Sequence, residues 1–183
     1  ALDVGPRPDY LATRRYQEVR YVALQRRLKD LAEIIATFRP QLIFHADYIW
    51  NINRRNLSVL YERNVCQTEL LCESALAADV KRIILFSDAT VYGPGVDSVS
   101  EETTPAPVLP LARSFLEAEQ IAGDYHCPEK TAIYILRCAP LYGPRIPAGM
   151  MMMARLIADG ILLGPPAAAD DRQVTVVSGR DLA

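Results

Sequence analysis

The stretch Ile83-Ile84-Leu85-Phe86-Ser87-Asp88-Ala89-Thr90-Val91-Tyr92-Gly93 decides the fold class. Its first four residues form a continuous apolar run, which is typical of a strand covered on both faces. A loop follows at residues 87–110 and leads into a predicted helix at 111–125 and a predicted strand at 131–138. A strand, a helix and a second strand in this order predict a βα unit of a parallel sheet.

The same alternation of strands and helices continues along the rest of the chain. Apolar residues recur at helical spacing from Leu28 to Phe38, and Pro40 separates that helix from the next apolar run. We therefore expect residues 1–183 to form a single α/β domain. The further expected elements are strands at residues 19–24, 41–46 and 174–177, and helices at residues 57–78 and 150–158.

Composition and charge exclude several classes of protein. Of the 183 residues, 50% are hydrophobic, and the formal net charge of -2 gives no electrostatic footprint for nucleic acid or an anionic membrane. No apolar run reaches the roughly 18 residues that a membrane span needs. The four cysteines and two histidines lack the close spacing of a metal site. We expect no bound metal, and a cytoplasmic protein with reduced thiols.

Several segments share their order and spacing with one enzyme family. A turn ending in Val91-Tyr92-Gly93 precedes the helix at 111–125, and the next strand carries Arg137 and runs into Tyr142-Gly143-Pro144. This arrangement resembles the extended short-chain dehydrogenase/reductase family, in its sugar-nucleotide epimerase/dehydratase branch. Further matches are Asn64-Val65 with Thr68, and the segment from Pro40 through Phe44-His45-Ala46.

The resemblance implies a Rossmann-like, doubly wound parallel sheet that lacks the first strand, the first helix and most of the C-terminal substrate region, so that residues 1–183 are a partial domain. It also implies NAD or NADP as cofactor and a nucleotide-sugar or other small molecule as ligand. The chain contains no Gly-rich turn of the kind that holds a dinucleotide pyrophosphate. By resemblance, the cofactor contacts would be Asp3, Ala46, Asn64, Ser87 and Pro140, and Thr90 would contact the substrate.

The catalytic positions of that family are altered in this sequence. Such enzymes use a Tyr-x-x-x-Lys pair, in which the lysine lowers the pKa of the tyrosine, and a Ser or Thr hydroxyl that orients the substrate. Here the tyrosine position is Leu111, the lysine position is Phe115 and the Ser/Thr position is Asp88. Leucine cannot titrate, and phenylalanine supplies neither charge nor a hydrogen-bond donor. Asp88 is the remaining candidate for catalysis, and the alternative for it is a polar turn residue.

Two further departures from the family pattern concern positions close to the cofactor. Asp47 stands at an alanine position of the His-x-Ala-Ala segment. Gln67 replaces the glycine of Asn-Val-x-Gly-Thr, where glycine permits close helix packing. Both changes indicate that the chain does not bind NAD in the ordinary way.

Three functions follow from this sequence. It favours a catalytically silent protein with a structural, binding or regulatory role. The first alternative is an active NAD(P)-dependent nucleotide-sugar epimerase, dehydratase or reductase whose Gly-rich cofactor loop lies upstream of the chain. The second is a scaffold subunit of a larger assembly, in which a protein partner or a second copy covers exposed sheet edges.

Overall fold

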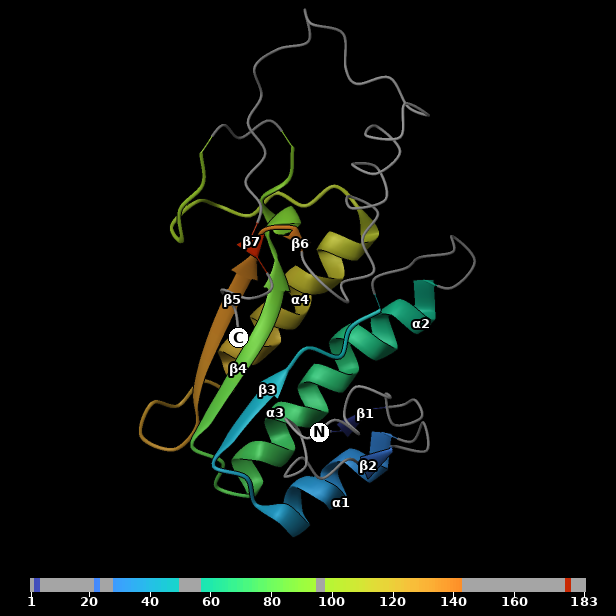
Figure 1. The fold of residues 1–183 in the computed structure, drawn as a ribbon, viewed down its shortest axis with the longest axis vertical. Helices are drawn as coiled ribbons and strands as arrows, with labels where there is room; N and C mark the ends of the chain where they lie inside the picture. The colour runs from blue at the N-terminus through green and yellow to red at the C-terminus, as the bar shows by residue number, and fades with distance from the viewer. Residues whose placement is uncertain are drawn as a thin grey trace, which may run out of the picture.

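The computed structural model describes residues 2–3, 22–23, 28–49, 57–94, 98–142 and 177–178. A three-stranded parallel sheet in the order β3-β4-β5 lies at the centre of this part (Figure 1). Ile43, Ile83 and Ile133 pair in one row across the sheet. The parallel pairing confirms the predicted α/β class. The three strands are β3 (Leu42–His45), β4 (Arg82–Asp88) and β5 (Ala132–Cys138).

Helices cover one face of this sheet. Figure 1 shows α3 and α4 behind the strands, and α1 packs beside α3. Leu31 and Ile35 of α1 and Leu85 of β4 belong to the buried core, because apolar residues at helical spacing meet alternate residues of the strands. The helical elements are α1 (Leu28–Phe38), α2 (Leu57–Tyr61), the π-helical turn η3 (Glu62–Cys66), α3 (Gln67–Ala77), the 3-10 helix η4 (Ala89–Tyr92) and α4 (Pro110–Asp124).

The opposite face of the sheet carries apolar side chains that water reaches. Phe44 on β3 is 61% exposed and Tyr134 on β5 is 51% exposed. The rings of Phe44 and Phe86 lie 6.5 Å apart.

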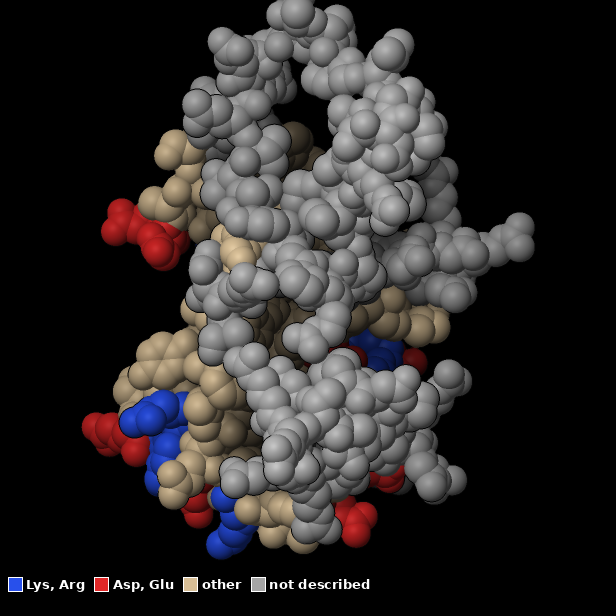
Figure 2. Space-filling model, in the orientation of Figure 1, with Lys and Arg blue, Asp and Glu red and all other residues tan. Residues whose placement is uncertain are grey.

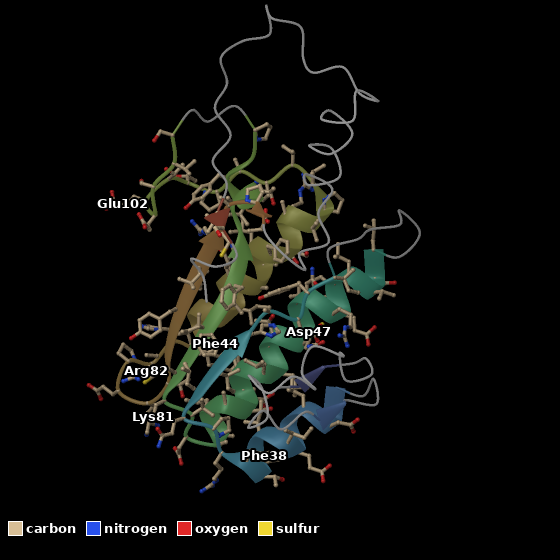
Figure 3. The ribbon with its side chains drawn as sticks, in the orientation of Figure 1. Phe38, Phe44, Asp47, Lys81, Arg82 and Glu102 are labelled. Atoms are coloured by element: carbon tan, nitrogen blue, oxygen red, sulfur yellow. The ribbon has the colours of Figure 1, made fainter. Side chains whose placement is uncertain are left out.

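Lys81 and Arg82, labelled in Figure 3, lie where β4 begins, and Figure 2 shows basic and acidic side chains mixed along that rim. The described rim therefore presents no patch of a single charge.

Most predicted elements are confirmed within the described residues, and two need correction. The helix predicted at 57–78 forms, but the wide turn η3 interrupts it, because there the backbone hydrogen bonds reach one residue further than in an α-helix. The loop predicted at 87–110 starts too early. Ser87 and Asp88 still pair with Arg137 and Cys138 of β5, and η4 follows at once.

Some predictions fall wholly or partly outside the described residues. Of the strand predicted at 19–24, the structure describes β2 (Val22–Ala23), which pairs in parallel with β1 (Leu2–Asp3). Of the strand predicted at 174–177, it describes the first residue of β7 (Val177–Ser178), which pairs with β6 (Leu141–Tyr142). The helix predicted at 150–158 lies outside the described residues. Among the helices that are described, none is both long and apolar enough to cross a membrane.

Candidate functional site

Several of the sequence-predicted site residues lie at or just after the carboxyl ends of neighbouring strands. β3 ends at His45, β4 at Asp88 and β5 at Cys138, and Asp88 pairs with Cys138. Because the three strands are parallel, these ends meet at one edge of the sheet. In open α/β sheets, ligands bind outside this edge. The structure therefore places Asp88 at the edge of the sheet where ligands bind in this class of fold.

Asp88 acts in the structure as the cap of a short helix. Its carboxylate Oδ1 accepts a hydrogen bond of 2.8 Å from the backbone N–H of Thr90, and Asp88 is the N-cap residue of η4. Aspartate is among the residues preferred at this position, because its oxygen satisfies an otherwise unpaired N–H. This contact gives Asp88 a structural role, and a catalytic role for it stays a prediction. Thr90, the predicted substrate contact, is exposed.

Beneath Asp88 lies a buried network that sequence reasoning missed. Ser87 Oγ donates a 2.5 Å hydrogen bond to Oε1 of Glu119, whose side chain is almost fully buried in α4. Arg137 of β5 binds the same carboxylate through Nε, at 3.0 and 3.1 Å from its two oxygens, and through Nη2 at 2.7 Å. The Nη1 group of Arg137 also donates to Tyr92 Oη at 3.1 Å. The hydroxyl proton of Ser87 is thus directed at Glu119, and a contact of Ser87 with a cofactor stays a prediction.

This network is held by charge as well as geometry. The hydrogen bonds to Glu119 raise the pKa of Arg137, and paired, multiply bonded charges are the form in which buried charges are tolerated. The signal available in the sequence was an acidic residue on the apolar side of a helix, together with an arginine inside an apolar strand. That signal does not say that Glu119 and Arg137 meet.

The positions that would carry Tyr and Lys in the family both lie on α4. Leu111 is half-buried and packs against the core. Phe115 is only 1% exposed, and its ring lies 5.0 Å from the ring of Tyr48 in an edge-to-face arrangement of 65°. Such a pair is favoured by the quadrupoles of the two rings. Phe115 is thus a core residue that solvent does not reach.

Asn64 has all of its side-chain hydrogen bonds within the protein. Its Oδ1 accepts from the N–H of Ile49 at 2.9 Å, and its Nδ2 donates to the carbonyl of Ile49 at 3.4 Å and to Ser114 Oγ at 3.0 Å. An amide has two N–H donors, and both are used here. The predicted cofactor contact therefore ties the segment after β3 to α4.

Asp47 and Gln67, the two departures noted in the sequence, are bonded to each other. Gln67 Nε2 donates to Asp47 Oδ2 at 2.8 Å, and Arg63 Nη2 forms an ion pair with the same oxygen at 2.9 Å. Asp47 lies between the end of β3 and the helices (Figure 3). Gln67 is 4% exposed, and its Oε1 is buried without a hydrogen-bond partner. An unpaired buried acceptor lowers the stability of the folded state. The side chain of Gln67 is nevertheless held in this buried place by its hydrogen bond to Asp47.

His45 is buried at the end of β3 and makes one defined hydrogen bond. Its Nε2 lies 3.1 Å from Thr68 Oγ1, which itself donates to the carbonyl of Asn64 at 2.7 Å. Because the hydroxyl proton is used there, His45 Nε2 carries the proton and donates. Burial lowers the pKa of His45 to about 4, so the ring is neutral at neutral pH.

The other predicted cofactor contacts are more loosely placed. Ala46 follows β3 and is exposed. Pro140 is also exposed, and its carbonyl accepts a hydrogen bond from the N–H of Val177 at 3.1 Å. Asp3 lies in β1 and pairs with Ala23 of β2. The contacts of these three residues with a cofactor stay predictions.

Comparisons with known proteins agree on one family. The model of the NAD dependent epimerase/dehydratase family matches residues 6–175. The UDP-glucose 4-epimerase of Mycolicibacterium smegmatis is 29% identical over 145 residues, which are 74% of this chain and 45% of that protein. A match to a UDP-glucose 4-epimerase of Yersinia pestis is 44% identical over 66 residues, 35% of this chain and 20% of that protein.

Solved structures show the same similarity. DesIV, a dTDP-glucose 4,6-dehydratase from Streptomyces venezuelae solved with NAD bound, superimposes with a TM-score of 0.72 at 27% identity, over 87% of this chain and 52% of DesIV. MoeE5 in complex with UDP-glucuronic acid and NAD gives a TM-score of 0.71 at 23% identity, over 86% of this chain and 51% of MoeE5. The predicted Rossmann-like fold is confirmed, and the chain spans about half the length of these proteins.

Proposed function

Because the chain belongs to the NAD dependent epimerase/dehydratase family, we propose that it is a catalytically silent member, whose Rossmann-like fold serves a structural, binding or regulatory role. Family membership describes a fold that binds NAD in relatives such as DesIV, and function depends on the residues at the site. The proposal therefore concerns the altered site residues. We expect a cytoplasmic protein.

The observation that carries the proposal is the burial of Phe115. A lysine at this position would have to reach a cofactor hydroxyl and lower the pKa of a tyrosine. Phe115 has no polar atom, is 1% exposed and packs on Tyr48. Its partner position is Leu111, which has no proton to give. The hydride chemistry of the family needs both groups together, and neither is present.

The alternative, an active epimerase, dehydratase or reductase that uses Asp88 or a water as base, receives less support. A general base needs a free lone pair directed at the substrate and a pKa near the working pH. One oxygen of Asp88 is engaged by the Thr90 N–H, where it caps η4. The second alternative, a scaffold subunit that binds a protein partner or a second copy of the chain, is compatible with a catalytically silent protein. It would be one example of the binding role proposed above.

A turnover assay on the full-length protein tests the proposal. UDP-glucose and dTDP-glucose are supplied with NAD, and epimerised or dehydrated products are followed by chromatography. We expect no product above the enzyme-free blank, while the Mycolicibacterium smegmatis epimerase, as a positive control, converts UDP-glucose. Any turnover would refute silence, and turnover that disappears in Asp88→Asn would favour the active alternative with Asp88 as the base. Asparagine is the matched replacement, because it still caps the helix but cannot act as a base.

A further inference from the structure

We propose that the side chains of Tyr48 and Phe115 fill the position that a nicotinamide cofactor would occupy and so close it. We further propose that the hydrogen bond between Asp47 and Gln67 holds this closure in place. The inference rests on the proposed function and deepens it, because it assigns a packing role to the residues that replaced the family's cofactor contacts. The residues present at these positions do not fit a dinucleotide, because their side chains pack against and hydrogen-bond to one another.

The first pair consists of two aromatic rings. Counted from His45, the two alanine positions of His-x-Ala-Ala fall on Asp47 and Tyr48. Tyr48 is 7% exposed, and its ring lies 4.9 Å from the ring of His45 and 5.0 Å from that of Phe115. Where the family pattern has a methyl group and a lysine, this chain has two large rings in contact. The ring of Tyr48 occupies space that an alanine would leave open.

The second pair is polar and joins Asp47, on the same segment as Tyr48, to Gln67 of α3. Asp47 is bonded to Gln67 at 2.8 Å and to Arg63 at 2.9 Å. The family pattern has alanine and glycine at the positions of Asp47 and Gln67, and neither of those residues has a polar side chain. The Asp47 carboxylate adds a negative charge, which repels a phosphate, and the Gln67 side chain fills the volume that glycine would leave. Both replacements thus work against a dinucleotide and add an internal contact.

The short segment that carries Asp47 and Tyr48 is fixed by three hydrogen bonds. His45 is anchored to Thr68, Asp47 to Gln67, and Ile49 to Asn64. Asn64, Gln67 and Thr68 all lie on the continuous helical stretch of η3 and α3. The backbone at Tyr48 is therefore held by contacts of its neighbours on both sides in sequence. The ring itself lies between those of His45 and Phe115.

Accessibility at position 115 tests the closure directly. In the full-length protein, Phe115→Cys is treated with a water-soluble maleimide, and the modified fraction at position 115 is followed by peptide mass spectrometry. We expect slow labelling that rises by about tenfold or more when Tyr48→Ala is added, since the cover is then removed. The control Tyr134→Ala, at an exposed tyrosine on the other sheet face, should leave the rate unchanged. Fast labelling without Tyr48→Ala, or no rise with it, overturns the closure.

A second measurement does not depend on how the variants fold. Thermal unfolding of the unmodified full-length protein is recorded with and without about 1 mM NAD, because a ligand that binds the folded state raises Tm. We expect no shift. A saturable rise in Tm without turnover overturns the closure and leaves catalytic silence standing. Turnover that needs no NAD, by a protein in which position 115 remains protected, refutes silence and leaves the closure standing.

Discussion

Returning the family's lysine to position 115 should destabilise the protein and should not restore its chemistry. Phe115 is among the fully buried side chains and packs on Tyr48. Phe115→Lys loses the packing of a large ring, for which Phe→Ala exchanges cost about 3–5 kcal/mol. The alkyl part of lysine replaces some of those contacts, but its ammonium group must be desolvated. We expect a loss of about 4–5 kcal/mol in the free energy of unfolding at pH 7.

The effect of Phe115→Lys should depend on pH in a defined direction. Burial lowers the pKa of a lysine, so the unfolded state binds more protons than the folded state between the lowered value and the ordinary value of about 10.4. The free energy of unfolding then rises with pH in that window. Urea unfolding of the full-length protein between neutral and alkaline pH, followed by fluorescence or circular dichroism, measures this slope relative to the unmodified protein.

Phe115→Met is the matched control for this experiment. Methionine is uncharged, flexible and close in volume, so we expect a loss of about 1.5 kcal/mol or less and no added pH slope. The reasoning is refuted if Phe115→Lys is as stable as Phe115→Met at pH 7 and shows no pH slope. Such a result would mean that the ammonium group reaches water and that position 115 is open.

Three further predictions concern other parts of the site. Glu119→Ala should lower the free energy of unfolding by about 3–5 kcal/mol, because it strands Arg137 beneath the sheet edge; Glu119→Gln, which keeps an acceptor, should cost clearly less in the same urea titration. The free energy of unfolding should fall by up to about 3 kcal/mol as the pH drops from 6.5 to about 4, because His45 takes up a proton at its ordinary pKa in the unfolded state but not in the folded state, where its pKa is about 4. His45→Gln should remove this part of the dependence of the unfolding free energy on pH, and an unchanged dependence would contradict the assignment. Gly93→Ala should cost about 1–3 kcal/mol in thermal unfolding, because Gly93 has φ of 78° and an added Cβ would collide with the Ala106 carbonyl; a neutral effect would show that this turn relaxes easily.

Local sequence patterns were sufficient for the elements of the fold. The apolar run at Ile83 and the helical spacing from Leu28 to Phe38 each lie within one element, so their periodicity predicts it. The wide turn at Glu62–Cys66 was not predictable in this way, because a single wide turn within a long helix leaves most of the apolar spacing intact.

The site was harder to predict than the fold, because its contacts join residues far apart in the sequence. The register of Asp88, Leu111 and Phe115 could be read from neighbouring motifs. The contacts around these positions could not: Glu119 of α4 meets Arg137 of β5, and Tyr48, which follows β3, meets Phe115 of α4. The sequence predicts which groups are replaced, and the packing shows what the residues at those positions contact.

The sheet face that no described helix covers has a consequence for handling the molecule. Helices lie on one side of β3, β4 and β5, and Phe44 and Tyr134 meet water on the other. A protein with an exposed apolar face tends to adsorb to hydrophobic surfaces, because its free energy falls when that face leaves water. The described part of the chain should therefore adsorb to plastic, to hydrophobic resin and to the air–water boundary, and losses on dilution should scale with the area of the container.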